Sequence, residues 1–310
     1  MNVSIIGGGI AGCATAYYLT RDGHDVTLFE RDSLASHASG FALGGLHPHI
    51  GGAADDPYEN LSHYSMGLHK QLAKTVSGTD SDDESLNFIR KPSLLLVKDQ
   101  AEAEAARRVY ETYAKDYSLD IRWLGLGELS HIDARISGDV LGGLYQGKAH
   151  ELDPYQLTLA IWQAAESQGA RIVNRNVTAI AIEGDHVSGV VTGGQNFEAD
   201  AVVAAAGPWS SELLSDVGVD VPITPLKGQI IRLNAPGPAL KVSLSWGTDY
   251  AMTKPDGLTW IGTTEEEVGF DDRTTDEARD RIIGSAVGML PYLEDAELVQ
   301  QTACLRPMAP

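Results

Sequence analysis

The amino-acid sequence predicts an α/β protein of two domains, one of which is built from two separate stretches of chain. Three observations lead to this class. The first 30 residues follow a strand, helix, strand pattern, a second segment of this kind begins near residue 146, and strands dominate from residue 222 onward. We therefore assign residues 1–85 and 146–221 to a nucleotide-binding domain. Residues 86–145 and 222–310 form the second, strand-rich domain, with a large antiparallel or mixed sheet.

The composition is that of a globular protein and excludes several classes of function. The chain has 310 residues, of which 43% are hydrophobic and 21% charged. Its formal net charge of -20 argues against binding to nucleic acid, which needs a clustered basic surface. We find no apolar run of about 18 residues and no basic leader, so we expect a cytoplasmic protein without a transmembrane segment. Two cysteines are too few for a disulfide framework.

The first segment predicts a strand over Asn2–Ile6, a glycine turn that opens a helix, and a second strand over Asp25–Glu30. Gly23 closes the helix. A nicotinamide-dependent dehydrogenase domain would continue with further strand and helix pairs. Residues 31–57 instead form a long loop rich in Gly, Ser and His, so the alternation stops there.

The later elements follow from periodicity and helix caps. Asp153 before Pro154 is typical of a helix start, and Gly169 of a helix end. We expect helices over residues 59–75, 99–117, 153–170 and 275–289, a strand over 93–97, a hairpin over 176–194, a buried strand ending at 205–207, and strands over 228–233, 242–246, 250–254, 258–264 and 298–305.

Gly7, Gly9 and Gly12 have the G-x-G-x-x-G spacing of dinucleotide-binding turns. The first glycine permits the tight turn, the second lets the backbone approach a pyrophosphate, and the third lets the helix pack on the strand. The helix N-terminus then supplies amide donors to the phosphates. Glu30 ends the next strand, where a carboxylate can accept both ribose hydroxyls, so we favour dinucleotide binding over a chance glycine turn.

The interrupted fold favours FAD over NAD as the dinucleotide. An extended dinucleotide that carries a flavin needs more than one chain segment along its length. Residues 202–209, VVAAAGPW, supply a second strand end whose small residues permit close approach. Taken alone, this stretch is also compatible with an ordinary buried strand and turn.

The order of eight motifs carries a resemblance to a known family. They are SIIGGGIAG, LFER, ASGFALGGLHP, HELDPYQLTLAI, VVAAAGPWS, PLKGQIIRL, TWIGTTEEE and CLRPMAP, and they span nearly the whole chain. In these motifs the chain resembles the FAD-dependent oxidoreductases of the D-amino acid oxidase family, and within it the glycine oxidases and related amino acid dehydrogenases. The resemblance implies a Rossmann-like FAD-binding domain and a substrate-binding domain.

The resemblance also implies which positions hold FAD. The pyrophosphate would lie at the glycine turn, the isoalloxazine ring beside the loop that follows the second strand, and the adenine near the start of the hairpin. The implied cofactor residues are Gly7, Gly9, Ile10, Ala11, Gly12, Glu30, Arg31, Ser39, Gly40, Gly44, Gly45, Leu46, Val177, Ala206, Gly207 and Trp209.

Two further residues are implied at the substrate. Tyr250 falls where these enzymes place a tyrosine over the substrate, and Arg306 where they place the arginine that binds its carboxylate. A planar guanidinium can hold a carboxylate through two parallel hydrogen bonds, which fixes its orientation. Flavin chemistry on an amino acid chiefly needs the α carbon held over the ring. The alternatives are a surface charge for Arg306 and a core tyrosine for Tyr250.

Several reactive side chains receive a more ordinary interpretation. His47 and His49 have no third ligand at matching spacing, so we expect a loop beside the flavin and no metal. Cys304 lies close to where relatives of the sarcosine oxidase type attach flavin covalently. We favour a packed strand cysteine there and non-covalent FAD.

The predicted activity is oxidation of the C–N bond of glycine, sarcosine or a D-amino acid, with oxygen or another acceptor reoxidising the flavin. One alternative is the flavin domain that modifies a carboxymethylaminomethyl group on a tRNA wobble uridine, although the acidic charge argues against it. Another is a non-catalytic or truncated flavoprotein, because family members continue beyond the Arg306-Pro307 motif with a segment that covers the flavin. The sequence does not fix the oligomeric state, and a homo-oligomer is one of the alternatives.

Overall fold

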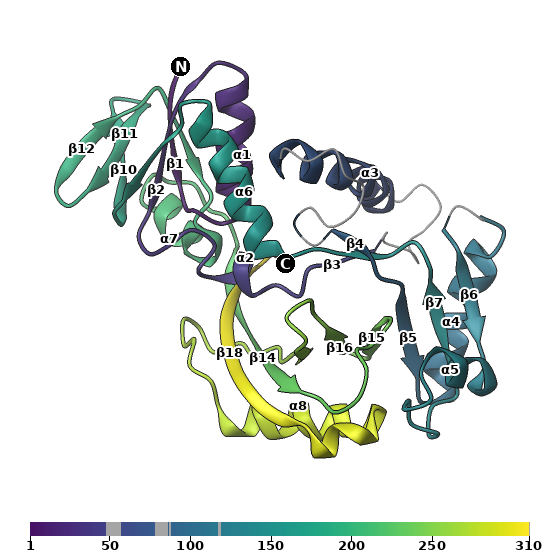
Figure 1. The fold of residues 1–310 in the computed structure, drawn as a ribbon. Coiled ribbons are helices and arrows are strands. Elements are labelled where there is room, and N and C mark those ends of the chain that lie inside the picture. Colours follow the sequence, from purple (N-terminus) through teal and green to yellow (C-terminus); the bar gives the residue numbers. More distant parts are fainter. Residues whose placement is uncertain (48–56, 78–85, 87, 117–118, 310) are drawn as a thin grey trace.

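The computed structural model describes residues 1–47, 57–77, 86, 88–116 and 119–309. Two sheet regions are joined by a small central sheet, and the end of the chain lies where the regions meet (Figure 1). The α-helices are α1 (Ile10–Arg21), α2 (Ala38–Phe41), α3 (Pro57–Ser77), α4 (Gln100–Tyr113), α5 (Leu126–Ile132), α6 (Pro154–Ser167), α7 (Ser210–Ser215) and α8 (Asp276–Met289), and the 3-10 helices are η2 (Gly207–Trp209) and η3 (Pro291–Asp295).

The first region is built on a four-stranded parallel sheet with the order β13-β1-β2-β9. Helices α1 and α6 lie together beside it, and their apolar side chains form one core with those of β1 and β2. A second core, which includes Phe29, Ile180 and Val190, joins this sheet to a three-stranded antiparallel sheet. The strands are β1 (Asn2–Ile6), β2 (Asp25–Glu30), β9 (Arg171–Asn174) and β13 (Ala201–Ala204), then β10 (Val177–Glu183), β11 (His186–Thr192) and β12 (Gln195–Glu198).

The second region is an eight-stranded mixed sheet with the order β18-β14-β17-β16-β15-β5-β7-β6. Its strand pairs are antiparallel apart from the parallel pair of β15 with β5. The strands are β5 (Ser93–Val97), β6 (Ile121–Leu124), β7 (Gly142–Gln146), β14 (Thr224–Asn234), β15 (Ser243–Trp246), β16 (Asp249–Thr253), β17 (Thr259–Gly262) and β18 (Glu297–Met308). This is the large mixed sheet that the sequence predicts.

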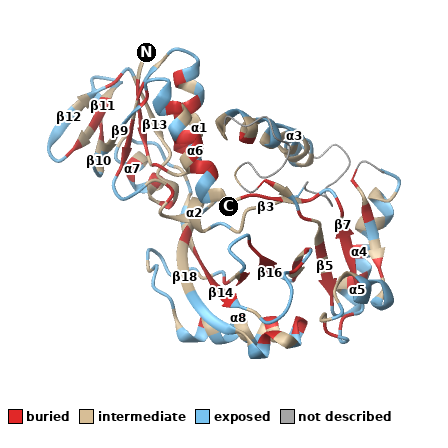
Figure 2. Ribbon diagram, in the orientation of Figure 1, coloured by how far each residue is buried: buried red, intermediate tan, exposed pale blue. Residues whose placement is uncertain are grey.

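Helix α8 covers one face of this sheet. Alternate strand residues, among them Ile231, Ala251 and Ile261, are fully buried in the core that also contains Ile282 and Ala286 of α8. Figure 2 shows this buried layer along β5, β14 and β16. Because side chains alternate across a strand, the residues between them project from the opposite face, which is free to carry a site.

A three-stranded sheet lies between the two regions, in the order β3-β8-β4, with β3 (Gly45–Leu46), β8 (His150–Glu151) and β4 (Ile89–Arg90). Glu151 on β8 is 1% exposed and lies between two buried lysines, 3.7 Å from Lys91 Nζ and 3.8 Å from Lys254 Nζ. Lys254 also donates hydrogen bonds to the carbonyls of Leu43 and Leu152. This cluster therefore ties β16 to the loop that leads into β3.

The structure corrects several expectations. The strand expected to be buried, β13, lies at the edge of its sheet, and its residues are only partly covered because one side has no neighbouring strand. The helix expected over residues 99–117 ends at Tyr113, and the sequence does not predict the short central strands.

Two helices have aspartate N-caps. Asp99 and Asp153 accept hydrogen bonds from Glu102 N and Gln156 N. His49 lies outside the described residues.

Candidate active site

A cavity of about 390 Å³ opens at the carboxyl ends of β1, β2 and β13, beside the N-terminus of α1. Its walls also include the loop at residues 33–39, the residues just before β10, and Leu305 and Pro307 of β18. The cavity thus runs from the first sheet to the strand that carries Arg306. The carboxyl ends of parallel strands are the usual position of nucleotide sites in sheets of this kind.

The glycine turn has no room for side chains. Gly7 has a positive φ of 110°, and a β-carbon there would come within 2.3 Å of the Ala205 carbonyl oxygen. A β-carbon on Gly12 would lie 1.9 Å from the Gly7 carbonyl oxygen. Gly9 is the N-cap residue of α1, and Ser39 Oγ accepts a hydrogen bond of 2.9 Å from Ile10 N. Helix, turn and β13 therefore pack so closely that only glycine fits, as a pyrophosphate turn requires.

Glu30 lies in the cavity wall and is 8% exposed. Its carboxylate accepts hydrogen bonds from Gly8 N at 2.6 Å and from Asp32 N at 2.8 Å, one on each oxygen. These bonds fix the orientation of the carboxylate but do not use all of its acceptor capacity, since each oxygen can accept a second hydrogen bond. The side chain is therefore available to ribose hydroxyls.

Part of the cavity is lined by an aromatic and cationic group around Trp209. The Arg31 guanidinium lies 4.0 Å from the centre of the Trp209 ring, and His37 packs against the same ring edge-on. Phe270 stacks on Trp209 with ring centres 5.6 Å apart. Because Phe270 follows β17, this stack joins the second sheet region to a residue that lines the cavity.

Most of the predicted cofactor residues line this one cavity, namely Gly7, Gly9, Ile10, Ala11, Glu30, Arg31, Ser39, Val177, Ala206, Gly207 and Trp209. The cavity lining does not include the remaining predicted residues, which are Gly12, Gly40, Gly44, Gly45 and Leu46. Gly40 and Gly44 pack against the carbonyl oxygens of Ala35 and Leu152, where a β-carbon would come within 2.1 and 2.2 Å. The sequence reasoning missed Gly8, Ser36, His37 and Ala205, although each lies inside or next to a motif that it used.

Tyr250 and Arg306 lie outside the cavity lining, on the face of the eight-stranded sheet opposite α8. Tyr250 pairs with Gly262, and Gly262 pairs with Ile230 on the next strand. Ile230 pairs in turn with Thr302 of β18, and Arg306 lies four residues further along that strand, so its side chain projects from the same face. The structure therefore brings together two predicted substrate residues that are far apart in the sequence.

Two strand glycines make space for these side chains, and the sequence reasoning missed both. A β-carbon on Gly262 would lie 2.9 Å from the Tyr250 hydroxyl oxygen. A β-carbon on Gly228 would lie 3.2 Å from Arg306 Nε and 3.1 Å from Thr263 Oγ1. Glycine inside a strand often marks such a close approach, so GQIIRL and WIGTT carried a usable signal.

The electrostatics of this face keep Tyr250 protonated. Burial raises the pKa of Tyr250 well above its ordinary value, and the Cys304 thiol adds to this effect, whereas the nearby Arg306 guanidinium lowers the pKa. The Tyr250 hydroxyl is therefore a hydrogen-bond donor across the neutral and mildly alkaline range. Burial also raises the pKa of Cys304, which disfavours the thiolate needed for covalent attachment of a flavin.

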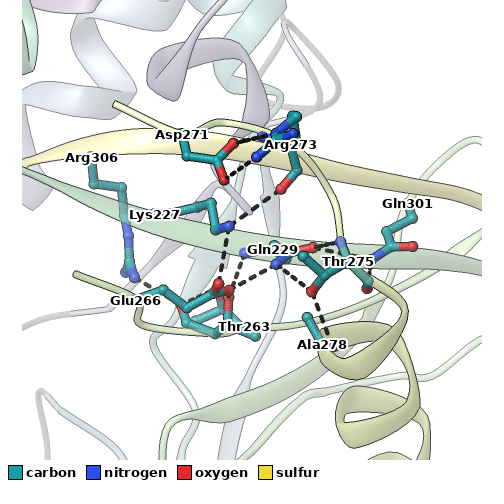
Figure 3. A network of polar contacts seen from close by, with 11 residues as sticks. Lys227, Gln229, Thr263, Glu266, Asp271, Arg273, Thr275, Ala278, Gln301 and Arg306 are labelled. Carbon is teal, nitrogen blue, oxygen red and sulfur yellow. Dashed lines mark hydrogen bonds and ion pairs between the residues drawn. The ribbon is translucent and has the colours of Figure 1, made fainter. Parts of the chain in front are cut away.

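The segment that follows β17, residues 263–266, positions the Arg306 guanidinium. Arg306 Nη2 donates a hydrogen bond of 3.1 Å to the Thr264 carbonyl oxygen. Figure 3 shows the same segment held from the other side, where Lys227 and Gln229 of β14 reach Glu266 at 3.0 and 2.8 Å. Gln229 also accepts from Thr275 N at 2.9 Å. The segment is thus fixed to β14 and helps to hold the arginine.

A family model described as FAD dependent oxidoreductase matches residues 2–310. The chain belongs to this family, and its cofactor is FAD. A glycine oxidase from Geobacillus kaustophilus is 28% identical over 309 residues, which cover 99% of this chain and 81% of the relative.

Two solved structures share the fold. The crystal structure of glycine oxidase from Geobacillus kaustophilus has a TM-score of 0.91 at 26% identity, covering 99% of this chain and 82% of that one. Iminodiacetate oxidase from a Chelativorans species has a TM-score of 0.87 at 25% identity, covering 99% and 84%. Both are similar to this chain along nearly all of its length.

The residues of the cavity fit FAD. The close-packed glycine turn leaves the backbone open to a pyrophosphate, and the buried Glu30 carboxylate is placed for ribose hydroxyls. Within the described ranges, no group of three or more His, Cys, Asp or Glu side chains could hold a metal ion. In the same part of the chain, no helix combines the length and apolar character needed to cross a bilayer.

Proposed function

We propose that this enzyme oxidises the C–N bond of a small amino acid or secondary amine, with glycine, sarcosine and D-amino acids as the substrate class. The observation that carries the proposal is the placement of Tyr250 and Arg306 on one sheet face, with Arg306 on the strand whose Leu305 and Pro307 line the nucleotide cavity. The relatives support it, since two proteins that match almost the whole chain are named glycine oxidase and iminodiacetate oxidase.

In this proposal the chain holds FAD through residues of both segments of the first region. The glycine turn at residues 7–12 and Ser39 face the phosphates, Glu30 and Arg31 the adenosine, and Val177 the adenine, whereas Gly40, Gly44, Gly45, Leu46, Ala206, Gly207 and Trp209 lie along the cofactor. Residues 1–85 and 146–221 then form the cofactor domain, and residues 86–145 and 222–310 the substrate domain. When bound, FAD supplies a two-electron acceptor for the hydride.

The substrate is oriented by the chain's own side chains. The Arg306 guanidinium would bind the substrate carboxylate through two parallel hydrogen bonds, and the protonated Tyr250 hydroxyl would donate a third. In the proposed reaction the α carbon of the neutral amine gives up a hydride to the acceptor that FAD would supply, which leaves an iminium ion. The iminium ion loses a proton to solvent, and water then hydrolyses the resulting imine. Holding the α carbon in place supplies most of the catalysis that such a step needs.

Anaerobic mixing with substrate tests this function. We expect glycine, sarcosine or a small D-amino acid to bleach the visible absorption of the purified FAD-loaded enzyme. Admission of oxygen should then restore the colour if oxygen is the acceptor, and an artificial dye should restore it otherwise. A flavin that stays oxidised with every member of this panel would refute the proposal.

A further inference from the structure

Three consecutive glutamates follow β17, and only the first faces Arg306. Glu265 Oε1 lies 3.6 Å from Arg306 Nη2, beside the 3.1 Å hydrogen bond from that nitrogen to the Thr264 carbonyl. The Glu265 side chain is 51% exposed and that of Arg306 is 36% exposed. Both charged groups are therefore accessible from solvent, at the point where a substrate carboxylate would have to arrive.

Glu265 and Glu266 differ in how their charge is balanced. The Glu266 carboxylate is bound by Lys227 at 3.0 Å, by Gln229 at 2.8 Å and by Thr264 Oγ1 at 2.5 Å. Among the described residues, Arg306 is the ion-pair partner that the structure gives to Glu265. When a substrate carboxylate takes over the guanidinium, the negative charge of Glu265 is left uncompensated beside it.

We propose that Glu265 makes the site selective for substrates that carry a single carboxylate. This inference rests on the proposed function, in which Arg306 binds the substrate carboxylate. In this arrangement a second carboxylate held near Glu265 meets a like charge, and like charges a few ångströms apart repel even where solvent screens them in part. The fold of iminodiacetate oxidase, an enzyme named for a dicarboxylate amine, is similar to that of this chain.

Sarcosine and iminodiacetate form a matched pair for the test. Both are N-substituted glycines, and they differ by a methyl group in place of a carboxymethyl group on the nitrogen. In Glu265→Gln we expect the ratio of kcat/KM for iminodiacetate to kcat/KM for sarcosine to rise at least about tenfold. Glu267→Gln is the control, because Glu267 is an exposed neighbour of the same charge, and it should leave the ratio within about twofold.

A binding measurement separates this inference from the catalytic proposal. Methoxyacetate and diglycolate are the ether analogues of sarcosine and iminodiacetate, and they have no C–N bond to oxidise. Their Kd values are measured from the change in the visible flavin spectrum of the FAD-loaded protein. We expect Glu265→Gln to tighten diglycolate about tenfold and methoxyacetate much less.

The outcomes of the two experiments distinguish the role of Glu265 from the catalytic proposal. Equal changes for both analogues, or the same change in Glu267→Gln, would overturn the role of Glu265 even in an active enzyme. An enzyme that oxidises none of the amines but shows the selective tightening would retain the role of Glu265 and refute the catalytic proposal. If neither analogue perturbs the flavin of the unmodified protein at millimolar concentration, the inference fails with the carboxylate site itself.

Discussion

Gly228 on β14 lies directly against the guanidinium of Arg306 on β18. A β-carbon at position 228 would come within 3.2 Å of Arg306 Nε and 3.3 Å of Nη2. The two strands pair over almost their whole length, with Gly228 opposite Cys304. This register places a glycine, which has no side chain, next to the space that the Arg306 side chain occupies. The orientation of Arg306 therefore depends on a residue that has no side chain to make a polar contact of its own.

Replacing Gly228 with alanine should displace the guanidinium without unfolding the protein, because the crowded atoms belong to side chains that can shift by a few tenths of an ångström. We expect KM for the amino acid substrate to rise about tenfold, with Tm nearly unchanged. Gly284→Ala is the control, since a β-carbon there meets no atom within 4 Å. An unchanged KM in Gly228→Ala would show that the glycine is not needed to orient Arg306.

Arg306→Lys tests the two-point grip on the carboxylate. A lysine keeps the positive charge but loses the planar pair of donors, so we expect kcat/KM to fall about 10- to 100-fold, which corresponds to one charge-assisted hydrogen bond of about 1.5–3 kcal/mol. The FAD content should stay normal. Arg279→Lys on α8 is the control for a surface arginine. A variant with undiminished kcat/KM would exclude Arg306 as the carboxylate ligand.

Gly12→Ala tests the packing of α1 on the glycine turn. A β-carbon 1.9 Å from the Gly7 carbonyl oxygen must push the helix away from the turn, which moves the amide donors of the helix N-terminus. We expect FAD to be lost on dialysis and Tm to fall by several degrees. Gly67→Ala in α3 should retain both properties, because no atom lies within 4 Å of its added carbon. Full retention of FAD in Gly12→Ala would contradict this account.

Glu266 should make the stability depend on pH on the acid side. Burial raises its pKa, but hydrogen bonds from Thr264, Gln229 and Lys227 outweigh burial and hold the pKa below the ordinary value of 4.5. The carboxylate therefore contributes stability that is fully present above pH 4.5 and is lost as the pH falls through the lowered pKa of the folded state.

Glu266→Gln should then lower the free energy of unfolding at pH 7 by about 2 kcal/mol, because Lys227 is left buried without its counter-charge. The difference from the unmodified protein should shrink as the pH falls below 4.5. Urea unfolding at a series of pH values measures it, with the exposed Glu267→Gln as control. A difference that is constant across this pH range would rule out a role for the ionised carboxylate.

Much of the cavity lining could be predicted from the sequence because its signals are local. A tight turn, a helix start and a strand end each depend on a few neighbouring residues, so Gly7, Gly9 and Glu30 could be assigned from spacing alone. Helix caps such as Asp153 were equally readable. The burial of β13 was predicted wrongly, because the number of strands beside a given strand is a property of the whole sheet.

The sequence by itself determined the βαβ start, the glycine turn and the family to which the chain is similar, since these follow from short-range patterns of residue size and polarity. Only the tertiary structure decided that Gly228 borders Arg306, that Glu265 faces the same guanidinium, and that the buried Glu151 carboxylate lies between two lysines. The physical reason is strand register. Pairing between distant strands fixes which side chains share a face, and a shift of one residue would turn Gly228 and Arg306 to opposite sides of the sheet.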